Sequence, residues 1–191
     1  IFFLHLLFSL SNRRFLQCVN HILKVLRIFG LILALFLLPA PAAAQVVISF
    51  YSHDLGSTFP HAFFTLKGKT ESGQHVDTNF GFTAKALTPA ILMGSVGGKI
   101  ETSKPSYVAS SDRQFSVQLD DRQYATVMAL VDKWRTLPGK SYNLNKRNCI
   151  HFVGEVAQAV GIKVVFEKHL LKKPKSFLLS LVALNPWLKG S

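Results

Sequence analysis

The stretch NKRNCIHFVGEVA, residues 145–157, predicts a helix that starts at Cys149. Asn148 is among the residues most favoured as a helix N-cap, and Gly161 is a typical residue for ending one. Positions spaced by four, three and four residues share one face of this helix: Cys149, Val153, Val156 and Val160. We therefore expect the Cys149 sulfur to point toward whatever the helix packs on.

A cysteine in this position has two interpretations. The exposed backbone N–H groups and the dipole of a helix start favour an anion, so the sequence predicts a lowered thiol pKa and a reactive Cys149. Free cysteines also pack as small apolar side chains. The rest of the chain bears on the choice between a reacting and a packing residue.

The first 44 residues contain no acidic residue and have the pattern of a secretory leader. Basic residues precede an apolar run over residues 28–38, which is shorter than the roughly 20 residues that span a bilayer. Ala42 and Ala44 match the small-residue cleavage pattern, so we expect cleavage between Ala44 and Gln45 and a periplasmic or secreted protein. The alternative is a retained N-terminal anchor, which would have to run through Lys24.

Residues 45–191 are predicted to form a single domain. Four of the 22 Lys and Arg residues lie in the leader and all 10 Asp and Glu residues follow it, so this domain carries a formal charge of +8. Such a domain is attracted to anionic polymers or lipid head groups, and export argues against nucleic acid as a partner. Cys18 leaves with the leader, which makes Cys149 the domain's only thiol and excludes an internal disulfide. No metal-ligand spacing is present, and no cofactor is expected.

Strand patterns come early in this domain and helix patterns come mostly late. Strands are predicted over residues 46–52, 61–68, 75–82, 97–103 and 115–119, and helices over residues 88–94, 120–137, 148–160 and 174–184. This order predicts an α+β fold with an antiparallel sheet packed against helices. Residues 104–112 are expected to form a loop and are a candidate lid.

The helix predicted over residues 174–184 is amphipathic, with lysines on one side and Phe177, Leu178, Leu181 and Val182 on the other. We expect a packing helix with a solvated lysine cluster. The alternative is a helix that lies on a membrane surface.

His61 is the candidate base for Cys149, because it begins a predicted strand and therefore lies at one end of the sheet. His53 ends the first strand and ranks behind His61. His151 lies only two residues after Cys149, but it projects from another side of the helix and is expected to pack or to form hydrogen bonds. His169 lies in the basic tail.

A thiol–imidazole pair commonly has a third group that orients the ring. If the hairpin turns near residues 71 and 72, Asn79 faces Thr65 and points to the same side of the sheet as His61. Asp77 and His75 share that side but lie farther along. The hairpin therefore ranks Asn79 first, then Asp77, then His75.

The box NCIHFV closely resembles the Asn-Cys-x-His-Phe-Val box of the lecithin retinol acyltransferase family. That family belongs to the circularly permuted branch of the NlpC-type, papain-like thiol enzymes, in which the catalytic histidine precedes the cysteine. GSTFPHAFFTLKG followed by NCIHFVGEVA has this order. The resemblance covers two short stretches and implies a permuted papain-like fold, Cys149 as nucleophile and His61 as base. It also suggests that Tyr142, in YNLNKRNC, lines the site.

The activity implied by this resemblance is acyl transfer through a thioester on Cys149. Exported NlpC-type enzymes cut amide bonds in peptidoglycan, which suits a leader and a basic surface, so a peptidoglycan peptidase or amidase is the leading expectation. The permuted branch also contains lipid acyltransferases, phospholipases and thioesterases, which makes membrane lipid the alternative substrate. A non-catalytic envelope-binding domain that keeps the fold is the second alternative.

Overall fold

The computed structural model describes residues 24, 45–54, 59–86 and 88–190. The leader expected over residues 1–44 lies outside these residues, apart from Lys24, and so does the Ala44 side of the expected cleavage site. The described residues from 45 onward belong to one compact unit. Within the described part of the chain, none of the helices has the length and apolar character needed to cross a membrane.

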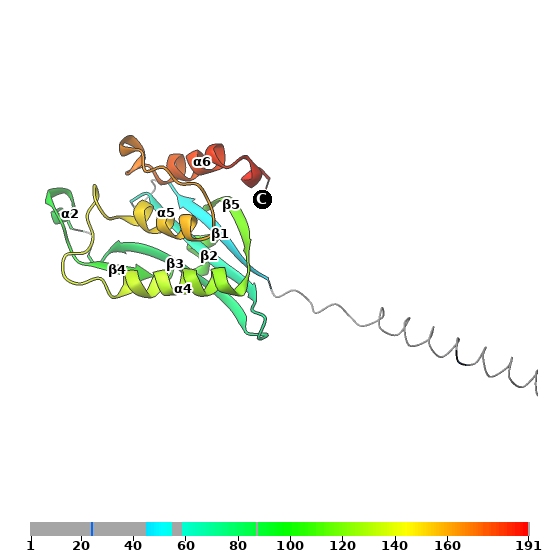
Figure 1. Ribbon diagram of the computed structural model, residues 1–191. Coiled ribbons are helices and arrows are strands. Elements are labelled where there is room, and N and C mark those ends of the chain that lie inside the picture. Colours follow the sequence, from blue (N-terminus) through cyan, green and yellow to red (C-terminus); the bar gives the residue numbers. More distant parts are fainter. Residues whose placement is uncertain (1–23, 25–44, 55–58, 87, 191) are drawn as a thin grey trace, which may run out of the picture. The chain divides into compact units, whose positions relative to one another are not determined.

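A five-stranded sheet forms the centre of this unit (Figure 1). Its strands are β1 (Val46–His53), β2 (His61–Lys69), β3 (His75–Ala84), β4 (Gly98–Glu101) and β5 (Asp112–Leu119). They lie in the order β4-β3-β2-β1-β5, and every neighbouring pair is antiparallel. The predicted α+β class with an antiparallel sheet is confirmed.

The β2–β3 hairpin has the predicted register, with Thr65 opposite Asn79. Its ladder ends at the pair Phe63 and Gly81, although β2 begins at His61 and β3 continues to Ala84. Beyond Gly81, β3 pairs only with β4. The hairpin is therefore open at this end: β2 and β3 no longer pair there, and His61 lies beyond the last pair.

Three helices cover one face of the sheet: α4 (Asp121–Arg135), α5 (Cys149–Ala159) and α6 (Pro174–Leu184). The capping box predicted at Asp120 begins α4, and Asn148 caps α5. Aromatic side chains fill the space between these helices and the sheet. Phe152 of α5 lies 5.6 Å from Phe64 and 5.3 Å from Trp134, measured between ring centroids.

The predicted helix over residues 174–184 is α6, and its apolar side belongs to the core. Phe177, Leu178 and Leu181 are completely buried, and Val182 packs against the same cluster. Packing is therefore the correct interpretation, and the membrane-surface alternative for this helix is wrong.

The opposite face of the sheet carries the short helix α3 (Pro105–Ala109). The prediction of a loop over residues 104–112 is wrong for residues 105–109, which form this helix. Pro105 occupies the first helical position, where its missing N–H and fixed φ favour a helix start. Tyr107 then stacks on His53 of β1 at 4.2 Å and packs against Phe63 of β2 at 5.7 Å, which holds the helix on the sheet.

The remaining elements are short. Helix α2 (Ala90–Met93) lies in the connection between β3 and β4 and falls within the predicted range of residues 88–94. Two 3₁₀ helices, η1 (Lys168–Leu170) and η2 (Pro186–Leu188), flank α6 in the sequence.

Candidate active site

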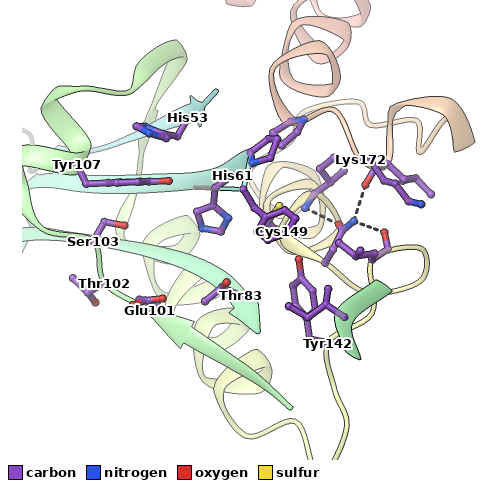
Figure 2. A pocket seen from close by; sticks show the side chains of 18 of the residues that line it. His53, His61, Thr83, Glu101, Thr102, Ser103, Tyr107, Tyr142, Cys149 and Lys172 are labelled. Atoms are coloured by element: carbon purple, nitrogen blue, oxygen red, sulfur yellow. Dashed lines mark hydrogen bonds between the residues drawn. The ribbon is translucent and has the colours of Figure 1, made fainter. Parts of the chain in front are cut away.

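The cap of α5 fixes the position of Cys149. Asn148 is 2 % exposed, and its Oδ1 accepts a hydrogen bond of 2.9 Å from the Ile150 N–H. Its Nδ2 donates to the backbone oxygen atoms of Leu144, at 2.8 Å, and Leu171, at 2.6 Å (Figure 2). One buried amide therefore joins the helix start to the segments before and after it. Cys149 follows directly and is itself buried, as a free cysteine.

His151 completes this cap as the third residue of α5. Its Nδ1 lies 2.9 Å from Asn148 Oδ1, and its ring stacks on Phe166 with 5.6 Å between centroids. The expectation that His151 forms hydrogen bonds and packs is confirmed.

Cys149 and His61 line the same pocket, which has a volume of about 980 Å³ and lies at the open end of the β2–β3 ladder (Figure 2). Tyr142, the predicted substrate-binding residue, lines it too, as does His53. The pocket is thus lined by three residues that the sequence indicated as site residues, namely Cys149 of α5, His61 of β2 and Tyr142 of the segment between α4 and α5. Within the described residues, no group of three or more His, Cys, Asp or Glu side chains is arranged to hold a metal ion.

Among the described residues, the His61 ring is held by packing and not by a hydrogen bond to an orienting side chain. It stacks on Phe63 at 6.1 Å and lies over Gly81, where an added Cβ would be 2.4 Å from His61 Nε2. Glu101, which pairs with Gly81 across β3 and β4, lines the same pocket. Figure 2 draws no hydrogen bond between His61 and the Cys149 sulfur.

The thiol is not activated in the way that the sequence predicted. Burial raises the pKa of Cys149 to about 11, although backbone N–H groups of Ala62, Ile150 and Cys149 itself favour the thiolate. The prediction of a lowered pKa is therefore wrong for this structure. The helix start does provide N–H groups to the sulfur, but removing a thiolate from water has the larger effect here.

His61 has the opposite shift. Burial, followed by repulsion from His53, lowers the pKa of its ring to about 4. The two histidines face each other directly across β1 and β2. Near neutral pH the pocket thus contains a neutral thiol and a neutral imidazole. A neutral imidazole has a lone pair with which it can accept the thiol proton during attack.

His53 is the candidate base that ranks behind His61. Its hydrogen bond to Ser111 determines which nitrogen of the neutral ring carries the proton. The hydroxyl of Ser111 donates its single proton to the Tyr107 backbone oxygen at 2.7 Å. The 2.9 Å contact between Ser111 Oγ and His53 Nδ1 must then have Nδ1–H as donor. His53 Nε2 is consequently the unprotonated nitrogen of the neutral ring, on a residue that lines the pocket.

Tyr107 is a pocket residue that the sequence did not indicate. It stacks on His53, and burial, followed by the nearby Cys149, raises the pKa of its hydroxyl to about 12. Its position depends on α3, in a segment that we expected to be a loop, so no local pattern pointed to it.

Tyr142 is largely buried beneath the pocket. It forms a bridge with Val96 and lies 5.7 Å from the Phe82 ring. Burial, followed by the nearby Cys149, raises the pKa of the Tyr142 hydroxyl. The side chain therefore stays a neutral hydrogen-bond donor at every pH at which the protein is usefully studied.

None of the three candidates for an orienting residue lines the pocket. The Asn79 amide exchanges two hydrogen bonds with the backbone of Ser103, at 2.7 and 3.1 Å, and so ties β3 to the residues after β4. Asp77 forms an exposed ion pair of 3.6 Å with Lys67. His75 is exposed at the turn end of β3. The structure does not bring any of them to the His61 ring.

No protein-family model, no curated protein and no solved structure matches this chain.

Proposed function

We propose that this chain is a cysteine-dependent hydrolase with a circularly permuted papain-like fold, exported to the cell envelope, that cuts amide bonds in peptidoglycan. One observation carries the proposal: a thiol at a helix start and an imidazole at a strand start line one pocket of about 980 Å³. The resemblance of NCIHFV to a known cysteine box supports the same chemistry.

The reaction would start from the neutral pair. The Cys149 sulfur attacks the substrate carbonyl carbon while His61 takes the thiol proton. The tetrahedral oxyanion forms next to the N-terminal N–H groups of α5, which stabilise negative charge. When it collapses, the carbon–nitrogen bond breaks and His61 returns the proton to the leaving amine. Water, deprotonated by His61, then hydrolyses the thioester and restores the thiol.

The charge of the domain supports an acidic polymer as substrate. Residues 45–191 carry a formal charge of +8, and Lys104 and Lys172 both line the pocket, with Glu101 as the acidic residue of the lining. Peptidoglycan stems have carboxylates that such lysines would attract. Membrane lipid is the alternative substrate, favoured by the exposed side chain of Phe59 and by Leu92 at the same pocket.

A non-catalytic binding domain is the second candidate function. The observation that favours it is the burial of Cys149 together with its raised pKa of about 11. Such a domain would use the pocket to bind envelope material without forming a thioester.

Product analysis separates these functions. Purified peptidoglycan and phospholipid vesicles are incubated with the wild type, Cys149→Ala and His61→Ala, and products are identified by mass spectrometry. The proposal expects new amine termini in peptidoglycan with the wild type alone. Fatty acid or transferred acyl groups would establish the lipid alternative, and turnover of neither by a folded wild-type protein would contradict both enzymes.

A further inference from the structure

The connection between β3 and β4 carries an apolar tip that the described part of the chain leaves exposed. Leu92 is 72 % exposed and Met93 is 89 % exposed, while Ile91 beside them is buried and anchors α2. Isolated exposed apolar residues are ordinary, but these two are consecutive. Leu92 also lines the pocket together with Phe59, another exposed aromatic residue. We call Leu92 and Met93 the α2 tip.

A second segment lies beside the α2 tip and adds positive charge. Residues 139–147 are joined to the α2 connection by the Val96–Tyr142 bridge and by a 3.0 Å hydrogen bond from Asn143 Nδ2 to Ser95 Oγ. Figure 1 shows this segment, which follows α4, next to α2. The segment contributes three exposed basic residues, and the α2 connection contributes a fourth; we call the set the basic collar, which consists of Lys85, Lys140, Lys146 and Arg147.

Within the two segments, no acidic residue offsets this charge. Residues 85–97 and 139–147 contain four basic residues and no Asp or Glu. Exposed apolar side chains surrounded by basic ones match the two layers of an anionic membrane surface, acyl chains beneath phosphate head groups. A protein partner would need shape complementarity over a larger area than two side chains provide.

We propose that the α2 tip inserts into an anionic lipid surface while the basic collar binds its phosphate head groups. Because Leu92 lies at once on the tip and on the pocket wall, docking would turn the pocket mouth toward the membrane. The interaction needs no catalysis, so it stands or falls separately from the proposed hydrolase. It also differs from the membrane interpretation of residues 174–184, whose apolar side is buried.

Co-sedimentation with vesicles tests this docking surface. The wild type is mixed with vesicles of phosphatidylcholine alone, or of phosphatidylcholine with phosphatidylglycerol, and the bound fraction is measured at low and high salt. We expect binding to the anionic vesicles that weakens with salt. The double variant Leu92→Ser/Met93→Ser should bind at least about tenfold more weakly. Lys85→Glu/Lys146→Glu should weaken vesicle binding by a similar factor, since each basic residue near an anionic surface strengthens binding roughly fivefold.

Leu179→Ser is the matched control, because Leu179 is also an exposed leucine, at 49 %, but lies on α6 and does not line the pocket. It should bind like the wild type. All substituted positions are exposed, so thermal unfolding should confirm intact folds before binding is compared. Lack of wild-type binding, equal binding by the tip variant, binding to peptidoglycan but not to vesicles, or a loss confined to Leu179→Ser would each overturn the proposal.

Discussion

The His61 ring occupies the space that a side chain at position 81 would fill. A Cβ added to Gly81 would lie 2.4 Å from His61 Nε2 and 3.2 Å from His61 Cε1. The backbone of Gly81 is not in the left-handed region, so glycine is required here for space and not for its conformational freedom. This close approach therefore helps to set the position of the candidate base.

Gly81→Ala should therefore damage activity more than stability. The added methyl group forces the His61 ring away from β3, and a displacement of about 1 Å at a reacting group can reduce the rate about a hundredfold. Overpacking of this kind destabilises a fold by roughly 1–3 kcal/mol. The measurements are kcat/KM for the Cys149-dependent reaction, the free energy of unfolding in urea, and the NMR signals of the His61 ring.

Gly97→Ala is the matched control for this variant. A Cβ at Gly97 would meet only the flexible side chain of Lys85, at 3.2 Å, so it should leave kcat/KM unchanged. If Gly81→Ala kept full activity and unshifted His61 signals, the role assigned to this contact would be wrong.

Asn148 should be more sensitive to substitution than an ordinary cap. Asn148→Ala removes the bond to the Ile150 N–H and leaves the Leu144 and Leu171 oxygens without their donor. We expect a loss of about 2–4 kcal/mol in the free energy of unfolding. Asn148→Asp should be no more stable than Asn148→Ala. Aspartate caps helices well, but its carboxylate would face two carbonyl oxygens here.

Asp120→Ala provides the comparison, since Asp120 caps α4 with an exposed capping box and has no such buried donors. Its loss should be about 1 kcal/mol. Equal losses for Asp120→Ala and Asn148→Ala, measured by urea unfolding, would contradict the argument that the two donated bonds matter.

These residues show which parts of the structure could be predicted from the sequence. The caps at Asp120 and Asn148 depend on neighbours two or three positions away, so local rules predicted both. The pairing of Thr65 with Asn79 followed from the hairpin turn alone. The hydrogen-bond partner of the Asn79 side chain could not be predicted in this way, because Ser103 follows β4, a different strand from those of the hairpin.

The chemistry of the site was less predictable than its location. The helix start indicated a lowered pKa for Cys149, but burial of the sulfur is a property of the whole packed domain and has the larger effect. Tyr107 was missed for a related reason. Only Pro105 signalled a helix in that segment, and the contacts of Tyr107 with His53 and Phe63 come from two distant strands.

His61 should make the fold less stable in mild acid. Its pKa is about 4 in the folded protein against 6.5 for an unperturbed histidine, so between these values the unfolded chain binds the proton and the folded protein does not. The free energy of unfolding therefore falls as the pH falls from about 6.5 to about 4, by roughly 1–3 kcal/mol from this residue. Urea unfolding across this range should show a smaller fall in His61→Gln.

His75→Gln is the control for the acid effect, because His75 is an exposed histidine on the same hairpin. A change in pH dependence that both variants share reports the loss of a histidine from the hairpin and not the burial of His61. A His61→Gln variant with unchanged pH dependence would show that the ring is protonated as easily when folded as when unfolded.

The reactivity of Cys149 distinguishes a neutral pair from a preformed thiolate–imidazolium pair. With a thiol pKa of about 11, the thiolate fraction in the resting protein rises about tenfold per pH unit up to about pH 10. The rate of alkylation by iodoacetamide should follow that slope without a plateau near neutral pH. His61→Gln should change this rate little, while abolishing hydrolysis if His61 is the base. Mass spectrometry of the Cys149 peptide measures the thiol separately from Cys18.

The same chain unfolded in urea serves as the reference, because its thiol should titrate near 9.0, the pKa of an unperturbed cysteine. Folding should therefore slow alkylation at every pH below that value. A plateau at neutral pH that disappears in His61→Gln would establish the ion pair instead, because a charged imidazole offsets the desolvation of a buried thiolate. Slow alkylation combined with rapid turnover would place deprotonation of Cys149 in the substrate complex, where His61 accepts the proton only as the carbonyl is attacked.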